Sequence, residues 1–246
     1  MINVVIPMAG AGSRFVKAGY NTPKPFIDVL GVPMVERVLV NLSMPGARYI
    51  LIARSDHLER GGAVLERIKE IYSPEIVVVD HLTEGAACTV LLAVRLLNDD
   101  TPLLIANSDQ IVDMNIADYV GDSRAHGLDG SILTFPSDHP KWSYVKHDEQ
   151  GLVTEIKEKV VISDKATVGI YYFERGRDFV ECACEMIANN DRVNNEFYVC
   201  PAYAYGIRHG LRIGSYHIPE HAMHGMGVPE DLDEYVALLN EKELAV

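Results

Sequence analysis

The first 110 residues alternate short apolar runs with longer stretches in which apolar side chains recur at helical spacing. The apolar runs predict strands at 4–6, 49–52, 76–79 and 103–106, and the periodic stretches predict helices at 33–42, 56–71 and 89–97. Because the strand runs do not alternate with polar residues, we expect parallel strands that helices cover on both faces. This pattern is typical of a doubly wound α/β sheet.

After residue 130 the pattern changes to alternating strands separated by turn signals such as Asp138-His139-Pro140. The alternation predicts strands at 131–135, 143–146, 153–156 and 167–173, followed by helices at 179–188 and 231–239. No linker-like composition, charge run or repeat interrupts the chain. We therefore expect a single domain over 1–246, in which the second half extends the same sheet.

Charge and cysteine content narrow the class of protein. The 22 Lys and Arg residues face 35 Asp and Glu residues, a formal net charge of −13, which disfavours nucleic acid or an anionic membrane as a partner. No apolar run reaches the roughly 18 residues of a membrane span, and the N-terminus lacks the basic region of a signal peptide. Four cysteines without a Cys-x-x-Cys pair indicate reduced thiols. We expect a soluble, cytoplasmic protein.

A glycine-rich loop, Ala9-Gly10-Ala11-Gly12-Ser13-Arg14, follows the first predicted strand. Glycines let backbone N–H groups converge on phosphate oxygens. The dinucleotide fingerprint needs a third glycine where Phe15 stands, and the P-loop motif is absent, so an oxidoreductase is disfavoured. Arg14 and Lys24, the latter between two prolines, are cations suited to a triphosphate, although either could be a solvated surface charge.

Asn107-Ser108-Asp109 follows the buried strand predicted at 103–106. Ligands of open α/β sheets bind at the carboxyl ends of the strands. A carboxylate that faces a phosphate loop there is suited to Mg²⁺, which takes oxygen ligands from carboxylates and substrate phosphates. The alternative is that Asp109 only caps the element that follows.

Residues 6–14 (IPMAGAGSR) and 23–26 (PKPF) resemble the signature of the sugar-phosphate nucleotidyltransferases, the nucleotide-sugar pyrophosphorylases. The similarity is greatest to short capsule- and lipopolysaccharide-type members without a β-helix extension. It implies a Rossmann-like nucleotidyltransferase fold with a mostly parallel mixed sheet, a nucleotide-binding half at 1–135 and an acceptor-binding half at 136–246. It also implies catalytic roles for Arg14, Lys24 and Asp109, with Asp109 as the metal ligand.

The same resemblance assigns binding residues. On the nucleotide side they are Ala9, Gly10, Ala11, Gly12, Ser13, Glu84, Gly85 and Asn107, with residues 83–89 similar to a segment that reads the nucleobase. On the acceptor side they are Glu158, Lys159, Gly169 and Glu196. A second metal-binding acid is expected before the segment that reads Gly227-Val228-Pro229-Glu230 here, and Gly225 stands in its place.

The implied reaction joins an NTP to a phosphorylated acceptor, most simply a sugar 1-phosphate, with Mg²⁺ as cofactor and pyrophosphate as the second product. The acceptor phosphate is already ionised at pH 7, so attack on the α-phosphorus requires positioning and charge stabilisation and no general base. A CTP-dependent enzyme for a non-sugar acceptor such as phosphocholine is one alternative. A non-catalytic nucleotide-binding homologue is another, suggested by Gly225. The sequence does not determine which nucleotide base or which acceptor the enzyme uses. For the oligomeric state we consider a homodimer.

Overall fold

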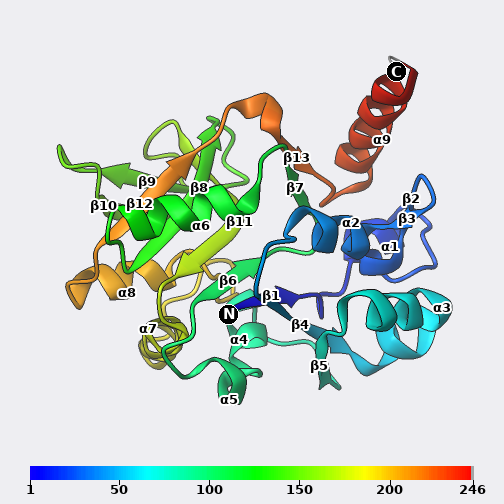
Figure 1. Ribbon diagram of the computed structural model, residues 1–246, viewed down its shortest axis with the longest axis horizontal. Helices are drawn as coiled ribbons and strands as arrows, with labels where there is room; N and C mark the ends of the chain where they lie inside the picture. Colours follow the sequence, from blue (N-terminus) through cyan, green and yellow to red (C-terminus); the bar gives the residue numbers. More distant parts are fainter. Residues whose placement is uncertain (245–246) are drawn as a thin grey trace.

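The strands of the first half form the parallel part of a nine-stranded sheet (Figure 1). In the computed structural model, which describes residues 1–244, β1 (Ile2–Pro7) pairs in parallel with β4 (Ala47–Arg54) and with β6 (Leu103–Ala106). β5 (Glu75–Val79) pairs with the far side of β4. The four strands predicted from apolar runs are confirmed.

The strands of the second half continue the sheet from β6. β11 (Lys165–Phe173) runs antiparallel to β6 and also pairs with β8 (Gly130–Pro136) and β9 (Ser143–His147). β10 (Val153–Glu158) lies outside β9, and β12 (Ile213–His217), which was not predicted, pairs in parallel with β8. The result is the predicted α/β architecture with a mixed sheet.

Helices cover both faces of this sheet (Figure 1). Those that pack on one face are α2 (Met34–Asn41), α3 (Ser55–Tyr72) and α6 (Ile116–Ala125), whereas α9 (Pro229–Leu244) packs against residues 223–225 at one end of the molecule. Those on the other face are α4 (Ala86–Leu91), α5 (Val94–Leu97), α7 (Gly176–Ala188) and α8 (Ala202–Arg208). In β1, Val4 and Ile6 join the first cluster and Val5 joins the second, which explains why the strand does not alternate with polar residues. None of the helices in the described chain combines the length and apolarity needed to cross a bilayer.

Two predicted helices differ in detail from the observed ones. The stretch predicted at 89–97 forms α4 and α5, because the first helix ends at Leu91 and the second begins at Val94. α3 contains a break at Gly62, whose φ of 46° is not helical. α6 and α8 were not predicted: each contains a glycine and residues of weak helix propensity, so their local sequences favour a helix only slightly.

The order of the strands defines where a ligand can bind. From β1 the chain goes first to β4 on one side and later to β6 on the other, so the direction of winding reverses between β1 and β6. The carboxyl ends of strands at such a reversal border a crevice that commonly binds ligands.

Short elements surround this crevice. The glycine-rich loop leads into α1 (Ser13–Lys17) and a 3₁₀ turn at Lys24–Phe26, followed by the hairpin of β2 (Asp28–Val29) and β3 (Val32–Pro33). Beyond β6, β7 (Gln110–Val112) pairs with β13 (Met223–Gly225), which follows a second 3₁₀ turn at Glu220–Ala222. The β7–β13 pair brings the C-terminal part of the chain to the end of β6.

Candidate active site

A cavity of about 530 Å³ opens at the carboxyl ends of β1 and β6; we call it the loop cavity. Its lining combines the glycine-rich loop, the end of β6 and a segment of the second half near residue 196. The predicted site residues among its lining are Gly10, Gly12, Ser13, Arg14, Lys24, Asn107, Asp109, Lys159 and Glu196. The fold thus brings together residues that are distant in the sequence.

The glycine-rich loop presents one side to this cavity. Gly12 caps α1 with a left-handed backbone (φ 60°), and a Cβ there would lie 3.2 Å from the Cβ of Lys24. Gly10, Gly12 and Ser13 line the cavity, whereas Ala9 is buried in the core and Ala11 faces a smaller cavity on another side of the loop. Backbone N–H groups near the start of α1 are therefore available to an anion.

Lys24 and Asp109 form an ion pair inside the loop cavity, from Lys24 Nζ to Asp109 Oδ2, although they lie 85 positions apart. Lys24 begins its 3₁₀ turn between Pro23 and Pro25, which restrict the backbone, and its side chain is 17% exposed. The predicted phosphate-binding cation and the predicted metal ligand are therefore in direct contact in the same cavity.

Asp109 is the predicted metal ligand, and Glu196 is the other carboxylate in the lining of the loop cavity. Within residues 1–244, no group of three His, Cys, Asp or Glu side chains has the arrangement of a metal site. A Cβ at Gly225 would lie 3.4 Å from Asp231 Oδ2, whereas a Cβ at Gly227 would lie 3.2 Å from Asp109 Oδ2. Fewer than three such ligands fit an Mg²⁺ ion that is held partly by substrate phosphates, and they do not fit an ion held by protein ligands alone.

A smaller cavity of about 160 Å³ adjoins the first; we call it the strand cavity. The two cavities share the lining residues Ala86, Asn107, Lys159 and Tyr198. The strand cavity is also lined by Gln110, Lys141, Trp142, Ser143, Glu158, Thr167 and Gly169. The predicted acceptor residues Glu158 and Gly169 thus lie beside the loop cavity.

Glu158 supplies a buried carboxylate to the strand cavity. It ends β10, is 7% exposed, and accepts a hydrogen bond from Ser143 Oγ through its Oε2. Burial raises the pKa of Glu158, and the hydrogen bond from Ser143 and the charge of Lys159 act in the opposite direction. A buried carboxylate in a cavity is a strong acceptor for hydroxyl groups of a ligand.

Gln110 is a site residue that sequence reasoning missed. Its side chain lines the strand cavity, is 8% exposed, and has an Oε1 atom without a hydrogen-bond partner among the described residues. Gly169 (φ 95°) is required next to it, because a Cβ there would overlap the side-chain amides of Gln110 and Asn107. The available signal was its place at the end of the polar run 107–110, directly before the apolar pair Ile111-Val112.

Lys159 lies at the boundary of the two cavities in an unusual conformation. Its φ is 57°, a left-handed value that a non-glycine residue adopts at a cost and that is common at functional sites. Its Nζ contacts the hydroxyl of Tyr198 and lies 4.4 Å from the centre of that ring. Tyr198 belongs to residues 195–198 (NEFY), which resemble an acceptor-side segment of the family, but no individual role was predicted for it. Burial, followed by the neighbouring Glu196, raises the pKa of its hydroxyl.

Glu196 is presented by a tight turn. Asn194 and Asn195 both have left-handed φ values (50° and 63°), and Val193 and Glu196 exchange backbone hydrogen bonds of 3.1 and 3.0 Å. Asn is among the residues that adopt this conformation most readily. The turn places Glu196 in the lining of the loop cavity.

The segment predicted to read a nucleobase packs against the chain that follows this turn. Phe197 N donates to Glu84 O (2.7 Å), Ala87 N donates to Phe197 O (3.0 Å), and Gly85 (φ 123°) lies so close to the Phe197 backbone that a Cβ would not fit. Ala86, and neither Glu84 nor Gly85, lines the cavities. A contact of Glu84 or Gly85 with a base stays a prediction.

Comparisons with known proteins identify the family of the chain. The family model described as nucleotidyl transferase matches residues 3–203. Mannose-1-phosphate guanylyltransferase catalytic subunit beta of Drosophila pseudoobscura pseudoobscura is 30% identical over 175 residues, which are 69% of this chain and 47% of the fly protein. The chain thus spans about half the length of the curated relatives it matches.

Solved structures share the fold over almost their whole length. A nucleoside-diphosphate-sugar pyrophosphorylase from Vibrio cholerae RC9 has a TM-score of 0.79 and 26% identity, covering 95% of this chain and 99% of that one. A UDP-glucose pyrophosphorylase complexed with UDP-glucose has the same TM-score at 18% identity, covering 98% and 100%. Since the family match covers most of the sequence, the chain belongs to the nucleotidyl transferase family, among its sugar-phosphate nucleotidyltransferases.

Proposed function

We propose that this chain couples an NTP to a sugar 1-phosphate and produces an NDP-sugar and pyrophosphate. The loop cavity takes the NTP and the strand cavity takes the sugar phosphate. Residues 1–135 supply most of the NTP side and residues 136–246 most of the acceptor side. The residues that cross this division are Ala86, Asn107 and Gln110 in the strand cavity and Lys159, Asn194, Glu196, Tyr198 and Gly227 in the loop cavity. The relative from Drosophila is a guanylyltransferase for mannose 1-phosphate, which supports this class of reaction.

The observation that carries the choice of acceptor is the chemistry of the strand cavity. Gln110 Oε1 has no partner there, and the Glu158 carboxylate lies in the same lining. Both groups accept hydrogen bonds, and sugar hydroxyls donate them. The quaternary ammonium of phosphocholine would be attracted by Glu158 and the aromatic rings, but it has no N–H or O–H to donate and would leave Gln110 Oε1 without a hydrogen bond. A sugar phosphate therefore satisfies this cavity better than phosphocholine does.

The arrangement supports an in-line displacement. An oxygen of the acceptor phosphate forms a bond to the α-phosphorus, and the bond from that phosphorus to the bridging oxygen of the β-phosphate breaks, so pyrophosphate leaves with the electron pair. Lys159, at the boundary of the cavities, neutralises the acceptor phosphate. Arg14, Lys24 and the loop N–H groups hold the triphosphate and stabilise the charge that develops on the leaving group.

Members of this family generally use a divalent metal ion. We propose Mg²⁺, held by Asp109 and the phosphates of the NTP. When bound, the ion supplies positive charge that offsets the charge of the phosphates. Lys24 then has two anionic partners in the same cavity, the carboxylate of Asp109 and the triphosphate.

A pyrophosphate-release assay tests the proposal. Each of ATP, CTP, GTP and UTP is combined with a hexose 1-phosphate, a heptose 1-phosphate or phosphocholine, with and without Mg²⁺. The proposal predicts metal-dependent release with a sugar 1-phosphate and no release with phosphocholine. Release with phosphocholine alone, or no release with any pair, would contradict it.

A further inference from the structure

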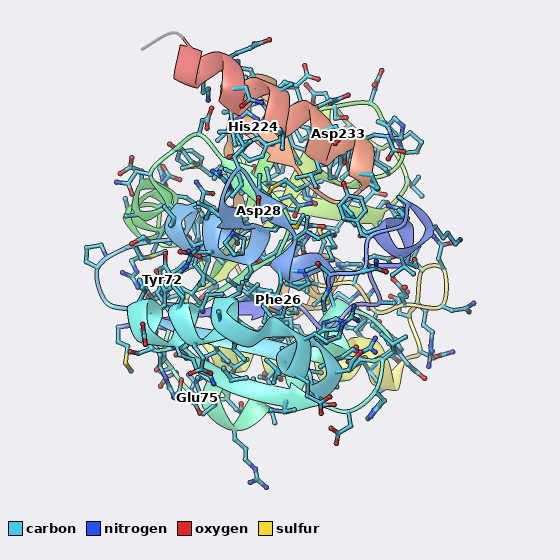
Figure 2. All side chains as sticks on the ribbon, turned by 90° about the vertical axis from the view of Figure 1, so that its right-hand side faces the viewer. Phe26, Asp28, Tyr72, Glu75, His224 and Asp233 are labelled. Atoms are coloured by element: carbon cyan, nitrogen blue, oxygen red, sulfur yellow. The ribbon has the colours of Figure 1, made fainter. Side chains whose placement is uncertain are left out.

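A third cavity, also of about 530 Å³, adjoins the strand cavity; we call it the helix cavity because α9 forms one wall. It shares the lining residues Lys141 and Trp142 with the strand cavity and none with the loop cavity. Its other walls come from the end of β8, the 3₁₀ turn at Glu220–Ala222 and β13. Figure 2 shows α9 across one end of the molecule, with the labelled His224 beside it.

The lining of the helix cavity combines aromatic rings with hydrogen-bonding groups. Trp142 is fixed by an edge-on contact with Phe135, with ring centres 5.3 Å apart, and Tyr235 packs beside His224 at the same separation. Exposed polar side chains, including His221 and Glu234, complete the lining. Aromatic faces with a few polar groups are the usual lining of a small-molecule site, and hydroxyl groups can both donate to and accept from such groups.

The boundary between the strand and helix cavities is easily opened. Lys141 Nζ lies 4.7 Å from the centre of the Trp142 ring and 3.6 Å from Asp231 Oδ1. The side chains of Lys141 and Asp231 are 46% and 28% exposed, and ion pairs in such surroundings are weak. Rotation of the flexible Lys141 side chain away from the boundary therefore costs little, whereas the Trp142 ring stays in place.

We propose that the acceptor is a sugar 1-phosphate that carries a further hydroxylated unit at the end of the ring remote from its phosphate. This inference rests on the proposed function. The phosphate and first ring occupy the strand cavity beside Lys159, and the added unit passes Lys141 to lie along Trp142 in the helix cavity. The much larger volume of the helix cavity and its polar and aromatic lining make it the specificity site for this unit.

Trp142 provides a direct test, because it is the single tryptophan of the chain and lines both cavities. Its fluorescence is followed during titration, without NTP, with glucose 1-phosphate, mannose 1-phosphate, a heptose 1-phosphate and the 1-phosphates of maltose and mannobiose. We expect at least one extended compound to bind at least tenfold more tightly than its parent hexose 1-phosphate. If no extended compound binds more tightly than its parent, the inference is wrong.

Variants of exposed lining residues locate the effect without disturbing the core. His221→Ala and Glu234→Gln should each reduce the advantage of the extended compound at least threefold and leave binding of the hexose 1-phosphate unchanged. Glu241→Gln, on the same helix and outside the lining, is the matched control. If both variants keep the wild-type ratio of the two affinities, the added unit does not bind in the helix cavity and the inference is wrong.

Two further outcomes separate this inference from the proposed function. If no sugar 1-phosphate supports pyrophosphate release, the proposed function fails. If hexose 1-phosphates support release and extended ones bind without competing with them, the helix cavity is an independent site and only the inference fails.

Discussion

The loop cavity and the strand cavity share four lining residues, yet the chemical groups in their linings differ. The loop cavity has backbone N–H groups, the cations of Arg14, Lys24 and Lys159 and two carboxylates, Asp109 and Glu196, and much of it comes from a short stretch of sequence. The strand cavity has buried acceptors, Glu158 and Gln110, that project from strands of both halves. A charged, open surface suits a triphosphate common to many reactions, whereas buried acceptors suit one particular set of hydroxyls.

This difference predicts that mutations in the two cavities have separable kinetic effects. Changes in the loop cavity should lower kcat, because in the proposed reaction its charges act on the phosphates that react. Changes in the strand cavity should raise the KM of the acceptor and leave that of the NTP unchanged.

Lys24→Ala should give the largest effect, a loss of about 10²–10³ in kcat, because it removes a positive charge aimed at the reacting phosphates. The measurement is the rate of pyrophosphate release, with circular dichroism to verify folding. Lys17→Ala, in the exposed last turn of α1, is the control. A kcat near that of the wild type in a folded Lys24→Ala protein would refute the role of Lys24.

Glu158→Ala should raise the KM of the acceptor about 10–100-fold, since a hydrogen bond to a charged group contributes about 1.5–3 kcal/mol. The KM of the NTP should change less than twofold. Glu155→Ala is a matched control in the same strand, where the carboxylate pairs with Lys146 at 3.1 Å on the surface. An equal rise in both KM values would remove the distinction between the cavities.

Tyr198→Phe tests the boundary and should have a moderate effect. The ring under Lys159 remains, but the hydroxyl that contacts its Nζ is lost. We expect the KM of the acceptor to rise about fivefold, corresponding to roughly 1 kcal/mol. Tyr205→Phe removes a comparable hydroxyl, which donates to Asp191 at 3.1 Å outside the cavities, and should change neither KM. No effect of Tyr198→Phe would show that Lys159 is positioned without it.

Glu158→Gln should have the smallest effect, a gain in stability at neutral pH. Because burial raises the pKa of Glu158, the folded state holds its proton more tightly than the unfolded state does. Its contribution to the free energy of unfolding is therefore complete below the ordinary pKa of 4.5 and is lost as pH rises through the raised value.

Glutamine does not titrate, so the Tm of Glu158→Gln minus that of the wild type should increase between pH 4 and pH 7.5. Each kcal/mol corresponds to about 2–4 °C in a domain of this size. The readout is thermal unfolding followed by circular dichroism. A difference in Tm that is constant with pH would contradict a raised pKa.

The contrast between the cavities also explains how much the sequence could predict. The glycine-rich loop, Arg14 and Lys24 were recognisable because one short segment carries the chemistry, and Asp109 because it follows a buried strand. The α/β class followed from the apolar runs.

Gln110 was not singled out, and Tyr198 was recognised only as part of the segment 195–198, because the importance of each residue depends on contacts across the fold. Gln110 stands out because its buried Oε1 lies beside Gly169 and has no hydrogen-bond partner in the described part of the chain. Tyr198 stands out because it contacts Lys159, which lies 39 positions away in the sequence. The positions of Gly225 and Gly227 relative to Asp109 likewise depend on the β7–β13 pairing. Patterns along the chain do not encode such contacts.

The two KM values of Gln110→Ala test most directly whether the two cavities bind the two substrates as assigned. Gln110 has an unpartnered buried oxygen in the strand cavity and lies outside the lining of the loop cavity. If this oxygen accepts a hydrogen bond from a sugar hydroxyl, the KM of the sugar 1-phosphate should rise about tenfold while that of the NTP stays within twofold. An unchanged acceptor KM, or an equal rise for the NTP, would contradict the assignment of the two cavities to the two substrates.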